Sequence, residues 1–215
     1  MRIQPTLHRC VLVLPLAGAL FGLAPAAASQ SLVTTVGEPI AYRVDLPAGA
    51  EISRDGPFLA AETPKHIVLV AAADLVAEAE YQLPVSDPEA RRILTSVFMD
   101  SDSLLLGLMD EGMRRRNVEL VGVVREIRTL GGQRAAYLRG GVGRRGTDGW
   151  MEMHVTVKDG IMYLLIVGGM GRAGARDETL AARIRDSFVL PDAPPPAASG
   201  PARSAYGLRG SSSSR

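Results

Sequence analysis

Three glycines near the end of the chain have the spacing of a motif that binds nucleotide cofactors. Gly169, Gly171 and Gly174 match the pattern G-x-G-x-x-G, between an apolar run, IMYLLIVGG, and a helical pattern. In dinucleotide-binding folds, such glycines bring the backbone close to a pyrophosphate at the start of a helix. One hypothesis for this chain is therefore an enzyme that binds a nucleotide or another small molecule with the Gly169–Gly174 loop.

The surroundings of these glycines argue against that hypothesis. The dinucleotide fold needs a parallel strand–helix–strand unit and an acidic residue about 20 residues beyond the motif. Here the apolar run is the second arm of a predicted antiparallel hairpin, and a proline-rich tail follows the helix directly. We therefore interpret the glycines as the joint between a central strand and the last helix. A second match, at Gly141, Gly143 and Gly146, leads into a strand and not into a helix.

Other catalytic chemistry is poorly supplied. After removal of the first 28 residues the chain keeps two histidines, His66 and His154, and no cysteine. Neither histidine has a partner in HxH or HxxxH spacing, so no zinc site is predicted. The sequence has no G-x-S-x-G motif, and a Ser–His–Asp triad around either histidine would be one of many combinations. We expect no catalytic, cofactor-binding or metal-binding residues, and no enzyme activity.

Residues 1–28 have the features of a secretory signal peptide. Arg2 and Arg9 precede the apolar run CVLVLPLAGALFGL. Three alanines then provide a cleavage site, which we place after Ala28. The apolar run is shorter than the roughly 20 residues that span a bilayer, so we expect no stable membrane span after cleavage. The sequence predicts a periplasmic or secreted protein, and an uncleaved anchor is the lesser alternative.

Cleavage would change the charge and the cysteine content. It removes two of the 24 Lys and Arg residues and none of the 23 Asp and Glu residues, so the formal net charge falls from +1 to −1. That balance argues against a nucleic-acid partner. The one cysteine, Cys10, lies in the removed segment, so the folded part must depend on a hydrophobic core.

The rest of the chain divides into a lead-in, one domain and a tail. We assign residues 29–37 to the lead-in, 38–190 to a single folded domain, and 191–215 to a disordered tail. The tail is rich in Pro, Gly, Ala and Ser, so it buries too little apolar surface to offset the entropy lost on folding.

Within the domain, the spacing of apolar residues changes from strand-like to helical and back. Strands are predicted over 40–46, 51–63 and 65–73, followed by a capped helix from Ser86 and a second helical stripe ending near Arg114–Asn117. Two hairpins with turns at Gly131-Gly132 and Asp159-Gly160 come next, and Asp177 is expected to cap a last helix. This order predicts an α+β domain. It is a mainly antiparallel sheet of about six to seven strands with helices on both faces, an α/β/α sandwich.

The two-residue turn at Asp159-Gly160 determines which side chains share a face in the last hairpin. One face is wholly apolar and should lie under a helix; it carries Met153, Val155, Val157, Met162, Leu164 and Ile166. The other face is mixed; it carries Trp150, Glu152, His154, Thr156, Tyr163, Leu165 and Val167. Its two large aromatic side chains either pack under a second helical layer, which we favour, or form an open patch for binding.

Three segments together have a familiar pattern: YRVDLPAGAEI near the start, the hairpin HVTVKDGIMYLLIVGG, and LAARIRDSFVL with Ser187 and Phe188 at its end. In these segments the domain resembles the PsbP-like superfamily. That group includes the extrinsic photosystem II subunit, a Ran-binding import factor and exported bacterial proteins. The resemblance implies an antiparallel sheet between helical layers, and a binding or assembly role without catalysis.

We therefore expect an exported, non-catalytic binding or assembly module whose partner is an envelope protein or another periplasmic component. The candidate partner-binding surface consists of Arg144 and Arg145, in a glycine-rich loop, with Trp150, His154 and Tyr163 beside it. A flexible basic loop with an aromatic residue at its base can contact a partner. For the loop itself, an ordinary exposed hairpin connection is the alternative.

Overall fold

The computed structural model describes residues 32–36, 40–77, 86–115, 119–143, 146 and 148–191. The predicted signal peptide with its cleavage site, and the tail from residue 192 onward, lie outside these residues. Within the described part of the chain, no helix is long and apolar enough to cross a membrane.

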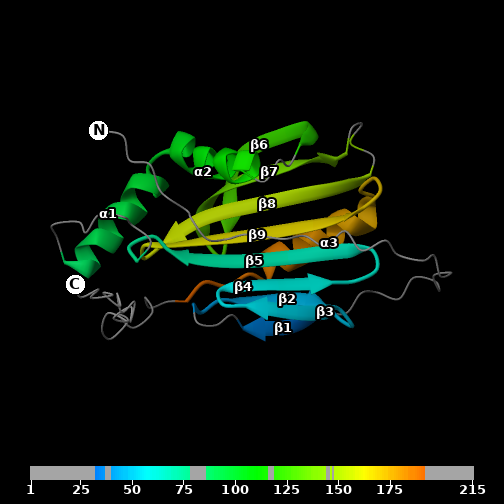
Figure 1. Ribbon diagram of the computed structural model, residues 1–215, viewed down its shortest axis with the longest axis horizontal. Coiled ribbons are helices and arrows are strands. Elements are labelled where there is room, and N and C mark those ends of the chain that lie inside the picture. The colour runs from blue at the N-terminus through cyan, green and yellow to red at the C-terminus, as the bar shows by residue number, and fades with distance from the viewer. Residues whose placement is uncertain are drawn as a thin grey trace, which may run out of the picture.

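An antiparallel sheet of seven strands forms the centre of the described fold (Figure 1). Its strand order is β3-β4-β5-β9-β8-β7-β6, and every pair of neighbours is antiparallel. The strands are β3 (Glu51–Asp55), β4 (Phe58–Glu62), β5 (His66–Asp74), β6 (Leu120–Leu130), β7 (Gln133–Val142), β8 (Gly149–Lys158) and β9 (Ile161–Met170). β9 is central and buried on both faces, which explains its nearly continuous apolar sequence.

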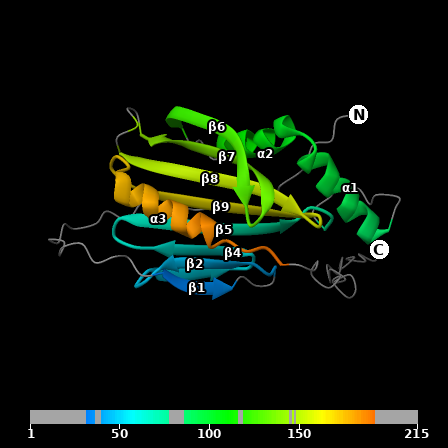
Figure 2. The ribbon, with the colours of Figure 1, turned by 180° about the vertical axis from the view of Figure 1, so that it is seen from behind.

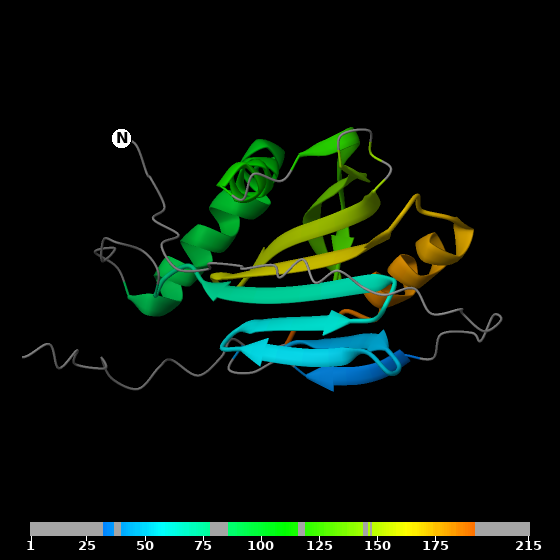
Figure 3. The same cartoon turned by 45° about the vertical axis from the view of Figure 1, so that its right-hand side comes forward.

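Helices cover the sheet on both faces (Figures 2 and 3). α1 (Asp87–Met99) and α2 (Asp102–Arg115) lie against β7 and β8 on one face. α3 (Ala175–Asp186) crosses β9 on the other face. The predicted α+β class, with a mainly antiparallel sheet between helical layers, is confirmed.

The sheet face under α2 is apolar, as we predicted from the register of the last hairpin. The turn at Asp159-Gly160 produces the expected register, in which Met153 pairs with Ile166. These two side chains join one buried cluster with Leu105 and Met109 of α2. Local turn chemistry therefore decides which side chains form this half of the core.

The opposite face is buried by α3 together with a small second sheet. β1 (Leu32–Val36) and β2 (Arg43–Pro47) form this antiparallel pair, and β2 also bridges to Val189, just after α3. Val44 of β2 packs in one cluster with Leu180 and Ile184 of α3. β1 lies in the segment that sequence analysis treated as a lead-in, where no strand was expected.

Three local predictions are wrong in detail. Residues 51–63, expected as one weak strand interrupted at Asp55-Gly56-Pro57, form the β3–β4 hairpin, because Gly56 adopts a φ of +55° and closes a turn at that interruption. The first predicted strand, 40–46, corresponds to β2, which pairs outside the main sheet. Ser86 precedes α1 as expected, but its side chain makes no capping hydrogen bond.

Candidate functional site

The glycine motif lies where β9 passes into α3. β9 is antiparallel to both of its neighbours, β5 and β8, so the strand arrangement of a dinucleotide-binding unit is not formed here. A Cβ atom on Gly169 would lie 2.7 Å from Trp150 Nε1 and 3.0 Å from His66 Cδ2. Gly171 has a φ of +71°, a conformation that favours glycine. These glycines let two side chains pack on the β9 backbone and let the chain turn toward α3.

A carboxylate of the same chain occupies the start of α3. The N-cap residue is Gly174, and Asp177, three residues later, accepts the Gly174 N–H at its Oδ2 atom over 2.8 Å. The expectation that Asp177 itself is the N-cap is therefore wrong, because the helix begins at Ala175. Helix N-termini favour negative charge, and Asp177 supplies it from within the fold. A phosphate at this helix end would have to displace that carboxylate.

Asp177 also joins α3 to the start of β5. Its Oδ1 atom lies 2.9 Å from Lys65 Nζ and 2.8 Å from His66 Nε2, and its side chain is only 5% exposed. Burial alone would raise the pKa of Asp177, but hydrogen bonds from Gly174, His66 and Lys65 outweigh burial and lower the pKa from 3.8 to about 2. We call Lys65, His66 and Asp177 the α3 clasp.

The α3 clasp is built to hold elements together. His66 is buried, and its Nδ1 atom has no hydrogen-bond partner among the described residues. The imidazole packs edge-on to the Trp150 ring, with 6.4 Å between the ring centroids. A general acid or base must reach the reacting atom of a substrate, and this imidazole is enclosed between β5, β8 and α3.

Most of the predicted partner-binding surface is not on the surface. Trp150 is 4% exposed, Tyr163 1% and His154 0%. Trp150 and Tyr163 belong to the apolar cluster under α3, which confirms packing as the role of both aromatic side chains. Assigning these three residues to an exposed surface was wrong, because Trp150 and Tyr163 pack in the core with α3 and β2, and His154 is buried beside the Tyr137 ring. Arg144 and Arg145 lie outside the described residues, so their part stays a prediction.

A row of polar and aromatic side chains runs inward from β6 beside α3. The Arg128 guanidinium lies 3.7 Å from the centre of the Tyr137 ring. That ring in turn lies 4.9 Å from the His154 imidazole, measured between centroids. His154 Nε2 is 3.5 Å from Glu152 Oε1. We call these four residues, from β6, β7 and β8, the polar column.

The inner end of the polar column carries an energetic cost. Glu152 Oε1 and both ring nitrogens of His154 are buried without a hydrogen-bond partner among the described residues. Leaving a buried polar group unpaired costs about 1–3 kcal/mol. Burial raises the pKa of Tyr137, and the negative charge of Glu152 raises it further, so this phenol stays neutral. The half of the sheet that carries the column is therefore much more polar than the half under α3.

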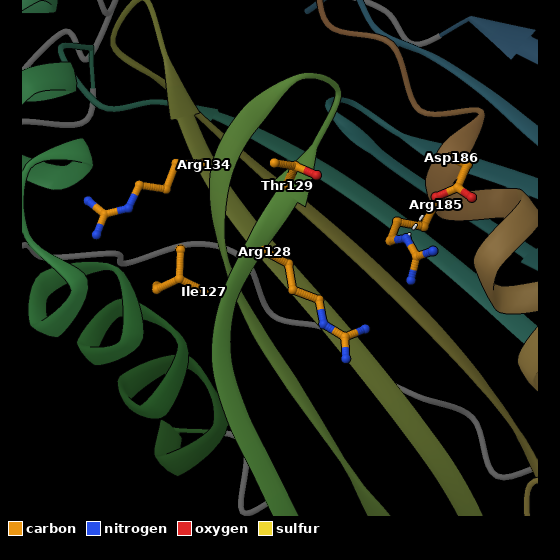
Figure 4. A pocket seen from close by; sticks show the side chains of 6 residues that line it. All are labelled: Ile127, Arg128, Thr129, Arg134, Arg185 and Asp186. Carbon is orange, nitrogen blue, oxygen red and sulfur yellow. Dashed lines mark hydrogen bonds and ion pairs between the residues drawn. The ribbon is translucent and has the colours of Figure 1, made fainter.

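The outer end of the polar column opens into a hollow between the β6–β7 hairpin and the end of α3 (Figure 4). The hollow has a volume of about 620 Å³ and is lined by Ile127, Arg128, Thr129, Arg134, Arg185 and Asp186. A smaller hollow shares part of this lining and adds Gly131, Gly132, Phe188 and Val189. We call the two together the arginine hollow.

Two guanidinium groups in the arginine hollow have unused hydrogen-bond donors. Arg128 binds Glu126 through Nε and Nη2, which leaves Nη1 without a partner in the described part of the chain. Arg185 uses Nε alone, 2.9 Å from Oδ1 of Asp186, and leaves both terminal nitrogens. Arg134 differs, since it donates to groups at the junction of α1 and α2 and points away from Arg128 (Figure 4). The hollow can therefore donate hydrogen bonds from Arg128 and Arg185.

No protein-family model matches the chain, and no curated protein matches it either. Among solved structures, the chain is similar to the solution structure of cyanobacterial PsbP (CyanoP) from Synechocystis sp. PCC 6803. The two are 14% identical, the match covers 81% of this chain and 100% of that chain, and the TM-score is 0.41. A similarity this distant carries no functional argument, so membership of the PsbP-like superfamily stays a prediction.

The sequence pattern pointed to His66 and Asp177 but not to the contacts that join them in the α3 clasp, and we did not predict the arginine hollow from it. Lys65 and Asp177 are 112 positions apart, and no local pattern relates them. Arg128 and Arg185 meet because the β6–β7 hairpin curls toward the end of α3 (Figure 2). Gly131 marks that approach, since a Cβ atom on it would lie 2.8 Å from Leu190. The available signal was the Gly131-Gly132 turn, which was assigned only to the hairpin.

Proposed function

We propose that this chain is an exported, non-catalytic module that binds an envelope protein or another periplasmic component. The observation that supports binding is which polar groups are buried and which are accessible. The imidazoles of His66 and His154 are buried, whereas the accessible hollow is lined by guanidinium groups. An arginine side chain stays protonated in proteins, so it can hold an anionic group but cannot serve as a general acid or base.

The proposed partner-binding surface is the arginine hollow. The loop with Arg144 and Arg145 follows β7, whose other end, at Gln133, borders the hairpin turn of the hollow. The loop and the hollow therefore belong to opposite ends of the same strand. The two can be tested separately.

Photocrosslinking in intact cells tests this function. A photoreactive residue at Thr129, which is exposed in the arginine hollow, should give one discrete product whose second component can be identified and bound again with purified proteins. The control position is Ile52 on β3, which is 45% exposed at the opposite edge of the sheet. A photoreactive residue at Arg145 tests the loop in the same way. If neither Thr129 nor Arg145 gives a discrete product, that result would argue against a binding function.

The nucleotide-using enzyme suggested by the glycine motif can be tested by thermal unfolding. A nucleotide at 100 times its dissociation constant stabilises a protein by about 2.7 kcal/mol, which is an easily measured shift. Asp177 already occupies the helix start where a phosphate would bind, so we expect no shift with nucleotides or dinucleotides. A shift that Gly169→Ala abolishes would restore the enzyme hypothesis.

A further inference from the structure

The arginine hollow also indicates which chemical group a partner presents, an inference that rests on the proposed binding function. We propose that the hollow binds a carboxylate on a peptide segment of the partner, held between Arg128 and Arg185. The two side chains extend into the hollow from β6 and from α3 (Figure 4). Guanidinium groups form short, charge-assisted hydrogen bonds with carboxylates, and two of them can share one carboxylate.

Arg128 is held in place before any ligand arrives. Its guanidinium rests on the Tyr137 ring at 3.7 Å, and its Nε atom donates to Glu126 over 2.7 Å. Contact with an aromatic face attracts a cation, and a side chain that is already ordered loses less entropy on binding. The Arg128 side chain is nevertheless 39% exposed, so a ligand in the hollow can reach it.

Arg185 is held more loosely on the facing wall. Its ion-pair partner is the next residue in the chain, Asp186, whose side chain is 68% exposed. The Arg185 side chain is 22% exposed, and an ion pair with such an exposed carboxylate contributes little stability, so a ligand can compete for the guanidinium. The hollow therefore has a well-held guanidinium, that of Arg128, on one side and a weakly held guanidinium, that of Arg185, on the other.

The surroundings favour a singly charged carboxylate over a phosphate. Glu126 and Asp186 stand beside the two arginines, so the local charge is nearly balanced, and a second negative charge on the ligand would be repelled. The neighbouring part of the hollow adds one exposed apolar side chain, Val189, which is 41% exposed. An acidic residue flanked by an apolar residue matches both parts.

The test uses the purified full chain, labelled with ¹⁵N, and a peptide probe, acetyl-Gly-Phe-Glu-Phe-Gly-amide. Saturable shifts should appear at the Gly131 and Gly132 amides and at Nε–H of Arg128 and Arg185. The same peptide with Gln in place of Glu should bind at least about tenfold more weakly, because it loses the charge-assisted bonds. Arg128→Gln and Arg185→Gln should each weaken binding by about tenfold.

The matched control is Arg125→Gln. Arg125 is an exposed arginine on β6 that pairs with Asp110 of α2, on the other face of the sheet. This variant should bind the Glu peptide as the wild type does. Arg185 lies in the last turn of α3 and makes no contact with the Tyr137 ring, so its variant remains informative even if Arg128→Gln fails to fold.

Four results would overturn the proposal. They are equal binding of the Glu and Gln peptides, equal losses in the Arg125 and Arg185 variants, tighter binding of inorganic phosphate than of the Glu peptide, and no saturable shift. If Thr129 still captures a partner in cells when Arg128 and Arg185 are replaced, the binding function stands and the carboxylate site falls. If no partner is captured while the peptide binds the hollow, the cellular function falls and the site stands.

Discussion

Replacing Asp177 with Asn tests whether the α3 clasp fixes α3 on the sheet. Asn keeps the size of the side chain and can still accept the Gly174 N–H, but it has no charge for Lys65 or His66. In the folded protein the pKa of Asp177 is about 2, against an ordinary value of 3.8. One pKa unit corresponds to about 1.4 kcal/mol, so Asp177→Asn should lower the free energy of unfolding at pH 7 by about 2 kcal/mol.

The same contribution must disappear in acid. Because the folded pKa lies below the unfolded value, the stabilisation is present above pH 3.8 and is lost as the pH falls through about 2. The difference between wild type and Asp177→Asn should therefore be complete at pH 7 and should shrink between about pH 4 and pH 2. The wild type itself should lose stability over this range.

Urea unfolding followed by tryptophan fluorescence measures this difference. Trp150 is the one tryptophan of the chain and packs against His66 of the clasp. The control is Asp186→Asn on the same helix, where the side chain is 68% exposed and the cost should stay below about 0.5 kcal/mol. A cost equally small for Asp177→Asn, or a difference that is the same at pH 7 and pH 3, would refute the reasoning.

Four further substitutions probe the packing and the hydrogen bonds that the structure describes. Gly169→Ala should lower the free energy of unfolding by about 1–3 kcal/mol, because its Cβ atom would lie 2.7 Å from Trp150 Nε1. Gly107→Ala in α2 should instead raise the free energy of unfolding by up to about 1 kcal/mol, because a Cβ atom there would have no other atom within 4 Å. Thermal unfolding measures both glycine variants. Arg91→Gln should speed amide hydrogen exchange across α1 and leave the global unfolding midpoint nearly unchanged, since Arg91 anchors a helix that is only partly buried. Thr156→Val should cost about 1–3 kcal/mol in urea, because a buried backbone carbonyl of β7 loses its 2.7 Å hydrogen bond.

Features governed by local chemistry could be predicted from the sequence. Asp159 adopts a φ of +51° and Gly160 one of +72°, so this pair forms the tight turn that its residue types indicated. From that turn follow the β8–β9 register and the two faces of the hairpin. The break between α1 and α2 was equally local, because Asp100 ends one helix and Asp102 starts the next.

Features that depend on contacts between distant segments could not be predicted. The role of Asp177 depends on Lys65 and His66, which lie at the start of β5, near the other end of the domain sequence. The pairing of β2 with β1 was missed because Leu32–Val36 was assigned to the lead-in, although Gly37 and Pro39, which are typical of turns, stand between the two strands. Trp150 was ambiguous because an aromatic residue on a mixed face fits either a core or a surface, and only the position of α3 decides between them.

The place of the arginine hollow follows from the two unlike halves of the face under α3. Leu180 and Ile184 of α3 pack in one apolar cluster with Val44 of β2. α3 packs on the apolar side of this face and leaves an accessible hollow on the β6–β7 side, although Glu152 and His154 are themselves buried there. Near the start of α3 this gap is bridged by an ion pair, with 2.8 Å between Arg139 Nη2 and Glu178 Oε1. The gap stays open only toward the end of the helix, which is where Arg128 and Arg185 converge. The hollow thus depends on where α3 packs on the sheet, and no short motif in the sequence could have indicated it.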